Sequence, residues 1–274
     1  MNSVNTNLGA MIALQNLNAI NADMQRTQNR ISTGLKVASA KDDPAIWSIA
    51  QSQRGQVNSL DAVKDSLSRV SSAVDVAMSA GESVQDLLTQ LKEKALAASD
   101  TSLDTTSRNA LQSDFTSIRD QITKTLSNAT FNGVNLLNGS RTSVAALANA
   151  SGTSHMTVMA ENLSLGGSII TLAANANFAT ATSASNLLTT LDSSINNVSA
   201  ALAKLGTSSK ALDSHATFIG KLQDTLTASI GKLVDADMAT ESTRLQALQV
   251  KQQLAIQALS ITNQSQSYLL SLFR

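Results

Sequence analysis

The chain has 274 residues, of which only 15% are charged and 3% are aromatic, and its 20 acidic side chains balance its 20 basic ones. A net charge of zero gives no indication of a nucleic-acid or anionic-membrane partner. The absence of cysteine excludes disulfides, zinc–thiolate sites and thiol catalysis. Because the sequence has no long apolar run, we expect no membrane-spanning helix and no cleaved secretory signal.

A heptad-like pattern predicts a first helix over roughly residues 5–33. Its register alternates steps of three and four residues: Ala10, Leu14, Leu17, Asn21, Met24, Gln28 and Ile31. The connector STGLKVASAK follows, and then Asp42-Asp43-Pro44 predicts a second helix start, because Asp caps free amides and Pro is favoured at the first helical position. The only tryptophan, Trp47, lies just inside this helix, so the stretch is interpreted as a joint between two layers.

Two longer registers predict straight helices with apolar seams of about 60 Å each. The first reads Leu60, Val63, Leu67, Val70, Val74, Ala77, Gly81, Val84, Leu88, Leu91, Ala95 and Ala98, with Gly81 as its one interruption. The second reads Leu191, Ile195, Val198, Leu202, Leu205, Ser209, Leu212, Ala216, Ile219, Gln223, Leu226, Ile230 and Leu233.

Between these helices the pattern changes several times. Residues 99–107 (SDTSLDTTS) predict a polar turn, and a shorter helical register follows from Leu111 to Thr125. The two Asn-Gly pairs in FNGVNLLNG (131–139) predict a hairpin. Residues 141–186 lose the helical period and are interpreted as a small, loosely patterned insert, with MTVMA and SIITLA as possible strands.

The C-terminal segment carries two apolar stripes. Leu254, Ile261 and Tyr268 are seven residues apart, and a second stripe beside them reads Leu248, Ala255, Thr262 and Leu269. Residues 1–22 and 252–273 contain no charged side chain, so the outer faces of both terminal helices carry neutral polar residues instead. Disordered tails are one explanation; the other, which we favour, is that other copies of the chain bury both ends, since buried charges are costly unless paired.

No constellation of catalytic residues is visible. His155 and His215 are far apart in the chain, and the carboxylate pairs Asp42-Asp43 and Asp235/Asp237 lie at predicted helix starts, where capping explains them. Phosphate-loop, dinucleotide-binding and metalloprotease patterns are absent. We therefore expect a protein that is not an enzyme and has no cofactor or metal.

Several segments resemble bacterial flagellin, in the order and at the chain extremes where that family carries them. They are VNTNLGAMIALQNLN (4–18), RISTGLKVASAKDD (30–43), FNGVNLL (131–137) and DADMATESTRLQALQVKQQLAIQALSITNQSQSYLLSLFR (235–274). The sequence departs from the family after Asp-Asp, where Pro44 and Trp47 replace small residues. It also departs in LTQLKEKALA, where Gln90 and Lys94 differ from flagellins that bind the innate immune receptor.

The resemblance implies five regions. Residues 1–46 are an N-terminal inner helix and spoke, 47–140 the N-terminal part of an outer helical domain with the hairpin, and 141–186 a short variable insert. Residues 187–235 are the C-terminal helix of the outer domain and 236–274 the C-terminal inner helix. The spoke residues are then Asp42, Asp43, Pro44 and Trp47, and the inner-layer assembly residues are Leu14, Leu17, Met24, Ile31, Leu248, Leu254, Leu259, Ile261, Tyr268 and Leu269.

The fold expected is mainly α, a long antiparallel helical bundle or coiled coil with a small β-hairpin insert, the termini forming a paired-helix inner layer. The resemblance implies a structural subunit of the extracellular flagellar filament, exported without a cleaved signal peptide. Its partners are then identical or sister flagellin subunits, an export chaperone at the C-terminal helix, and filament-cap and hook-junction proteins. A hook-filament junction protein and a cytosolic coiled-coil scaffold remain as alternatives. The scaffold is disfavoured, because the positions flanking the 60–98 seam lack complementary charges.

Overall fold

The computed structural model describes residues 7–271, with side chains to 264, and contains five helices and one two-stranded sheet within that range. The helices are α1 (Leu8–Thr33), α2 (Pro44–Ala98), α3 (Thr105–Asn128), α4 (Ala181–Val234) and α5 (Met238–Ser271), and the strands are β1 (Ser143–Leu147) and β2 (His155–Met159). The expected mainly α fold with a small hairpin is confirmed. The chain divides into two compact units, residues 1–55 with 225–274 and residues 56–224.

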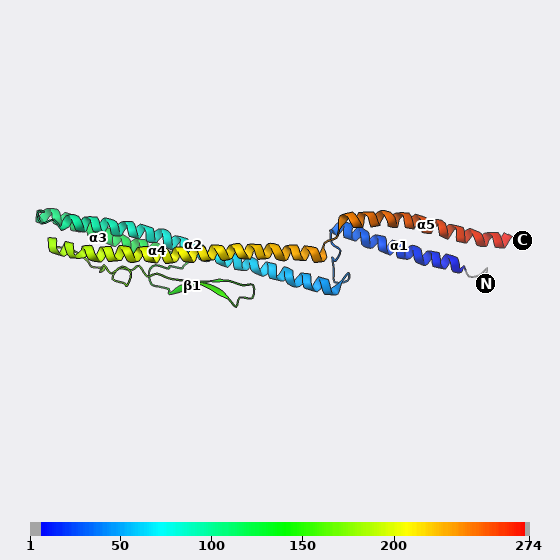
Figure 1. Ribbon diagram of the computed structural model, residues 1–274, viewed down its shortest axis with the longest axis horizontal. Coiled ribbons are helices and arrows are strands. Elements are labelled where there is room, and N and C mark those ends of the chain that lie inside the picture. The colour runs from blue at the N-terminus through cyan, green and yellow to red at the C-terminus, as the bar shows by residue number, and fades with distance from the viewer. Residues whose placement is uncertain (1–6, 272–274) are drawn as a thin grey trace. The chain divides into compact units, whose positions relative to one another are not determined.

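The larger unit is a bundle of α2, α3 and α4 (Figure 1). All twelve positions of the 60–98 register are buried, and no position of the 191–233 register is exposed. Hydrogen bonds also join α2 and α4. The Gln223 side chain donates to the Val57 carbonyl at 3.2 Å and to the Asp61 carboxylate at 2.7 Å. The heptad periodicity therefore identified the inner faces of both long helices.

The packing of α4 against α2 explains why a glycine occupies position 81 of the α2 register. A Cβ at this position would lie 2.5 Å from Cδ2 of Leu202, closer than two carbons can approach. The missing side chain on α2 therefore provides the hole that receives Leu202 from α4, as a small residue does opposite a large one in a packed helix interface.

The turn between α2 and α3 is held by Arg108. Its guanidinium donates to the carbonyls of Ala98, Asp100 and Leu103 at 3.0–3.1 Å, which satisfies the open end of α2. Asp104 caps α3 by accepting from the Ser107 amide at 3.0 Å, and hydrogen bonding to the hydroxyl and amide of Ser107 lowers the pKa of the Asp104 carboxyl. The polar turn predicted for residues 99–107 is present at residues 99–104, and α3 begins at Thr105.

The segment after α3 differs from the predicted hairpin. Asn132 and Gly133 form a tight turn with positive φ angles of 48° and 75°, and the flanking residues exchange two backbone hydrogen bonds of 2.9 Å. The chain then leaves strand geometry because buried Asn135 turns it inward. Its amide donates to the Leu126 carbonyl at 2.7 Å, and its oxygen accepts from the amides of residues 137 and 138.

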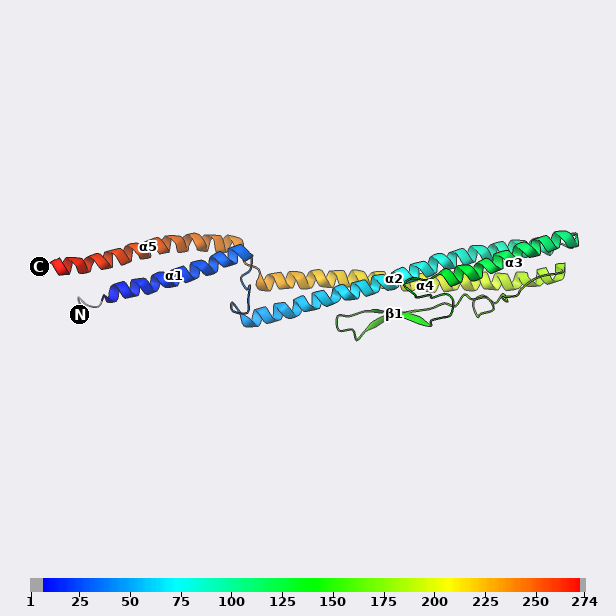
Figure 2. The same ribbon diagram turned by 180° about the vertical axis from the view of Figure 1, so that it is seen from behind.

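The hairpin lies later, within the expected insert. Strands β1 and β2 pair antiparallel with Ser143 opposite Met159 and Leu147 opposite His155. MTVMA therefore forms a strand as predicted, whereas SIITLA does not. The hairpin lies along the bundle (Figure 2), where the Leu147 amide donates to Ser66 on α2 and the carbonyl of Ala148 is 2.8 Å from the ring nitrogen of His215 on α4.

The second half of the insert has no regular structure and is still packed into the bundle. Its fully buried side chains are Leu163, Ile170, Leu172 and Phe178. The ring of Phe178 meets that of Phe115 edge-on, with centroids 5.2 Å apart. Thr180 caps α4 by accepting from the Ser183 amide, so the helix begins at Ala181, six residues before the sequence-based boundary.

Candidate self-assembly surface of the terminal helices

Helix α1 presents one buried side and one exposed side. Asn7 caps its start by accepting from the Ala10 amide at 2.9 Å, and Gly34 ends it with a left-handed φ of 70°. Seven positions at alternating steps of three and four are buried or half-buried, and we call them the α1 seam: Ala10, Ala13, Leu17, Ile20, Met24, Thr27 and Ile31.

Helix α5 runs antiparallel to α1, and both views show the two side by side (Figures 1 and 2). Among residues 238–264, only seven positions are not exposed, again at steps of four and three. We call them the α5 seam: Glu241, Leu245, Leu248, Gln252, Ala255, Leu259 and Thr262. The predicted stripe through Leu248, Ala255 and Thr262 is thus the one that packs within the chain.

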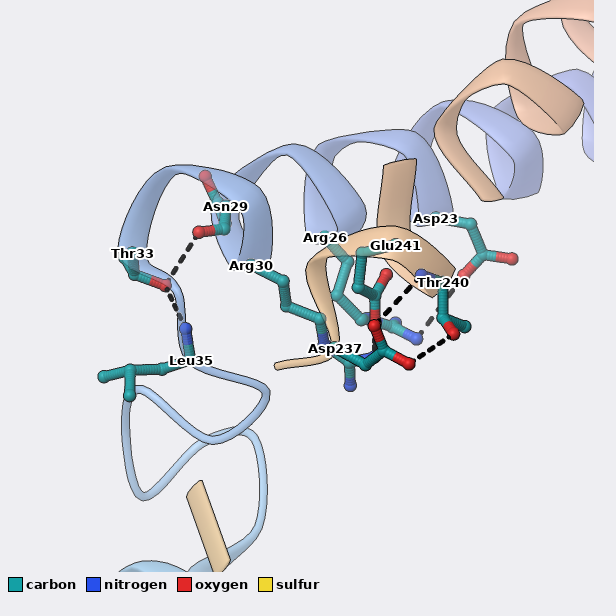
Figure 3. A network of polar contacts seen from close by, with 9 residues as sticks. All are labelled: Asp23, Arg26, Asn29, Arg30, Thr33, Leu35, Asp237, Thr240 and Glu241. Carbon is teal, nitrogen blue, oxygen red and sulfur yellow. Dashed lines mark hydrogen bonds and ion pairs between the residues drawn. The ribbon is translucent and has the colours of Figure 1, made fainter. Parts of the chain in front are cut away.

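Three polar contacts cross between the helices. The Gln252 amide donates to Asn21 at 2.7 Å, Arg30 donates to Glu241 at 2.9 Å, and Asn7 donates to the Thr262 carbonyl at 3.3 Å. Figure 3 shows the Arg30–Glu241 end of the pair, where Glu241 is only 7% exposed. A buried carboxylate needs a partner of opposite charge, and Arg30 supplies it.

The predicted spoke residues form the start of α2 and a tight turn just before it. Asp43 accepts from the amides of Ala45 and Ile46 at 3.0 Å, and Pro44 is the first residue of α2, as predicted. Asp42 accepts from the backbone amides at 38 and 39 and from the Ser39 hydroxyl, and these hydrogen bonds lower the pKa of its carboxyl. Trp47, one turn into α2, is half-buried and Pro44 is exposed.

The connection after α1 is also bonded to the end of α4. The amides of Lys36 and Val37 donate to the carbonyl of Val234, and the amide of Ala236 donates to the carbonyl of Gly34 at 2.8 Å. Asp237 then caps α5 by accepting from the amide and hydroxyl of Thr240, which lowers the pKa of its carboxyl. The connector is therefore a bonded element and not a loose linker.

Both terminal helices also expose a stripe of apolar side chains. On α1 the exposed side chains are Leu8, Met11, Ile12 and Leu14, with exposed fractions from 49% to 67%. On α5 Val250, Leu254 and Ile261 follow one face at 56–67% exposure, and Ile256 lies beside them. We call these two sets the outward stripes. Contiguous exposed apolar side chains of this kind mark surfaces that another molecule covers.

The structure divides the predicted assembly residues into two groups. Leu17, Met24, Ile31, Leu248 and Leu259 belong to the seams within the chain. Leu14, Leu254 and Ile261 belong to the outward stripes, and the side chains of Tyr268 and Leu269 lie outside the described residues.

The register predicted for the first helix was correct at every seventh residue and shifted between them. The structure uses positions 13 and 27 where the sequence pattern suggested 14 and 28, and it half-buries both Ile20 and the predicted Asn21. Spacings of three and four fit both phases equally well from sequence. Arg30, Glu241 and Gln252 were not predicted at all, although polar residues in the phase of an apolar stripe were the signal that could have found them.

Several titratable groups cap helix ends or form ion pairs. His155 is exposed on β2, and no group of three or more potential metal ligands exists among the described residues. Asp42, Asp43 and Asp237 each accept hydrogen bonds from a helix or turn terminus. In the part of the chain that the structure describes, no helix is long and apolar enough to cross a bilayer.

Comparisons with known proteins agree with this geometry. The family model of the bacterial flagellin N-terminal helical region matches residues 4–142, and that of the C-terminal helical region matches residues 188–273. The chain is 56% identical to flagellin FljM and 54% to FljO of Caulobacter vibrioides, in each case over all of this chain and 99% of the relative. A flagellin of Brucella melitensis is 37% identical over 82% of this chain and 83% of its own length.

A solved structure shares the fold at much lower sequence similarity. The flagellar hook-associated protein from Vibrio parahaemolyticus is 15% identical and superposes with a TM-score of 0.59, covering 71% of this chain and all of that one.

Proposed function

The chain belongs to the bacterial flagellins, and from this premise we propose that its subunits join through the outward stripes of α1 and α5. Membership of the family makes it a structural, polymerising subunit of the extracellular flagellar filament, and we infer that it has no catalytic role. Similarity along the full length to filament flagellins favours this role over a hook-filament junction protein or a cytosolic scaffold.

The observation that carries the proposal is the pair of exposed apolar stripes on helices whose end segments, 1–22 and 252–273, have no charged side chain. Complete burial of one large aliphatic side chain contributes about 1.5–3 kcal/mol, so a half-exposed leucine retains roughly 1 kcal/mol to be gained. Val250, Leu254 and Ile261 together offer roughly 3 kcal/mol per subunit from one helix face alone. Repeated in every subunit, this gain supports polymerisation.

The neutral polar residues of the ends support the same proposal. A side chain enclosed by several subunits loses contact with water. Burying an unpaired charge there would cost on the order of several kcal/mol. Glutamine, asparagine, serine and threonine lose far less when they find hydrogen-bond partners. Residues 1–22 and 252–273 keep only such neutral groups.

We assign the regions of the chain on this basis. Residues 1–46 and 236–274 form the inner layer of the filament, and 47–140 with 187–235 the outer helical domain. Residues 141–186 are the variable insert. Asp42, Asp43, Pro44 and Trp47 serve as the spoke, supported by the caps that stiffen both sides of this joint.

The remaining partners follow from the apolar surface of α5. A chain that exposes Leu254 and Ile261 before assembly needs them covered, which supports an export chaperone on this helix. Filament-cap and hook-junction proteins would meet the same terminal helices at the filament ends. We expect the subunit to leave the cell through the flagellar export apparatus without a cleaved signal peptide.

The test is a charge placed on one outward stripe. Leu254→Asp would bury an unpaired carboxylate in every subunit, so filaments should be absent by electron microscopy after salt or seeds are added. Leu254→Met keeps volume and polarity and should assemble. Leu96→Asp changes a leucine of equal exposure, 58%, in α2 outside the proposed surface, and it should also assemble. Filaments from Leu254→Asp would overturn the proposal.

A further inference from the structure

The seams of α1 and α5 could pair in more than one register. Apart from Glu241 and Gln252, both seams repeat every seven residues with small or aliphatic side chains, so a slide of one heptad, about 10 Å, keeps most apolar groups facing each other. Charged neighbours usually prevent such slips in paired helices, but residues 1–22 and 252–273 have none. The backbone bonds that join the connector to Val234 and Ala236 hold one end of the pair, and side chains along the two helices have to hold the rest of the observed register.

Two side-chain pairs distinguish the observed register from its neighbours. Asn21 bonds Gln252 at 2.7 Å, and Arg30 bonds Glu241 at 2.9 Å. Asn21 lies nine residues before Arg30, and Gln252 lies eleven after Glu241, so both pairs form in the same antiparallel alignment to within about half a helical turn.

A slide in one direction breaks both pairs. It would bring Glu241, which is 7% exposed, opposite Asp23, and it would leave Arg30 beyond the end of α5. Asn21 would then face Leu245, and Gln252 would face a leucine of α1. Two carboxylates in a half-buried interface and two unpaired amides all oppose this alignment.

A slide in the other direction is opposed as well. Arg30 would face Leu248, and Glu241 would lie beyond Thr33, where α1 ends. Asn21 would face Leu259. The loss of the partner of Glu241 and the placement of the Arg30 guanidinium against a leucine make this alignment unfavourable even though the aliphatic contacts persist.

We infer that Asn21–Gln252 and Arg30–Glu241 are the register-determining pairs of the terminal helices. They act as a buried polar residue does in a coiled coil, favouring one alignment and penalising the others. The inference deepens the proposed function. Only its consequence for contacts between subunits rests on that function. The register decides how far the outward stripe of α5 lies from that of α1, so it sets the combined surface that another subunit meets.

The absence of native cysteine allows a direct measurement of register. Leu17→Cys with Ala255→Cys reports the observed alignment, because these residues stand on the same side of the Asn21–Gln252 contact, four and three residues away. Leu17→Cys with Leu248→Cys reports a slide of one heptad in one direction. Leu17→Cys with Thr262→Cys reports a slide of one heptad in the other direction. Disulfides need Cα atoms within about 7 Å, so a reporter one heptad out of register cannot close.

Oxidation is carried out on the full-length soluble chain and on filaments, and intramolecular products are quantified by electrophoresis. With the native pairs present, the 17–255 product should exceed each slipped product by about tenfold or more. The all-leucine variant replaces both pairs at once, by Asn21→Leu, Gln252→Leu, Arg30→Leu and Glu241→Leu. In this variant the yields of the three disulfide products should lie within about twofold of each other. The control Asn16→Leu with Gln253→Leu makes the same kind of change at two exposed positions and should retain the excess.

A second variant tests the charge pair by itself. Arg30→Glu should reduce the 17–255 product, and adding Glu241→Arg should restore it. The inference is overturned if the all-leucine variant keeps the tenfold excess, if the exchange of charges fails to restore it, or if the unmodified reporters show no preferred product. Each of these results concerns pairing within one chain and is independent of whether Leu254→Asp blocks filaments, so failure of the register and failure of the assembly surface are distinguishable.

Discussion

We predict that the irregular second half of the insert contributes to the free energy of unfolding as the bundle helices do. Truncation of the Phe178 side chain tests this prediction. Its side chain is fully buried and meets Phe115 edge-on at 5.2 Å. Truncating a buried phenylalanine costs about 3–5 kcal/mol, which already includes the lost ring contact. For a unit of this size, 1 kcal/mol lowers Tm by about 2–4 °C, so Phe178→Ala should lower it by roughly 6–20 °C.

Thermal unfolding of the soluble chain, followed by circular dichroism at 222 nm, measures the effect. Met159→Ala is the matched control, since it truncates an insert side chain that is 61% exposed on β2, and it should move Tm by less than about 2 °C. Phe115→Ala and the double variant complete a cycle, in which the two losses should be less than additive because the rings contact each other. A Phe178→Ala chain with the Tm of the control would show that the insert is not part of the bundle core.

Three further predictions concern the bundle and the joint. Gly81→Ala places a Cβ 2.5 Å from Leu202, so it should destabilise the chain by about 1–3 kcal/mol in denaturant titrations; Leu202→Ala in the same chain should recover part of the loss, and additive losses would contradict the hole assigned to this glycine. The pKa of Asp237 is lowered by its bonds to Thr240, so its stabilising effect is present above pH 3.8 and is lost as the pH falls below it; Asp237→Asn should flatten that part of the stability–pH curve, and an unchanged curve would refute the capping role. Trp47→Ala should alter filament form in electron micrographs while the helix content of the soluble chain stays nearly constant, and an unfolded chain would instead place Trp47 in the subunit's own core.

Much of this protein was determined by local sequence patterns. Apolar residues at steps of three and four encode the inner face of a helix whatever it packs against, which is why every position from Leu60 to Ala98 in the first long register is buried. Asp43 and Pro44 encode a helix start through one hydrogen-bond acceptor and one fixed φ angle. The absence of charge at both ends likewise predicts, from composition alone, helices that other subunits cover.

Only tertiary structure decided which of several equivalent patterns is used. The two stripes of α5 are both apolar, and contact with α1 turns Leu248 inward while Leu254 remains exposed. Phe178 lies in a segment without periodicity, so its burial depends on Phe115, more than sixty residues earlier in the chain. Periodic spacing records which residues share a face, whereas the partner of that face is set by contacts between segments far apart in sequence, and local preferences carry no information about them.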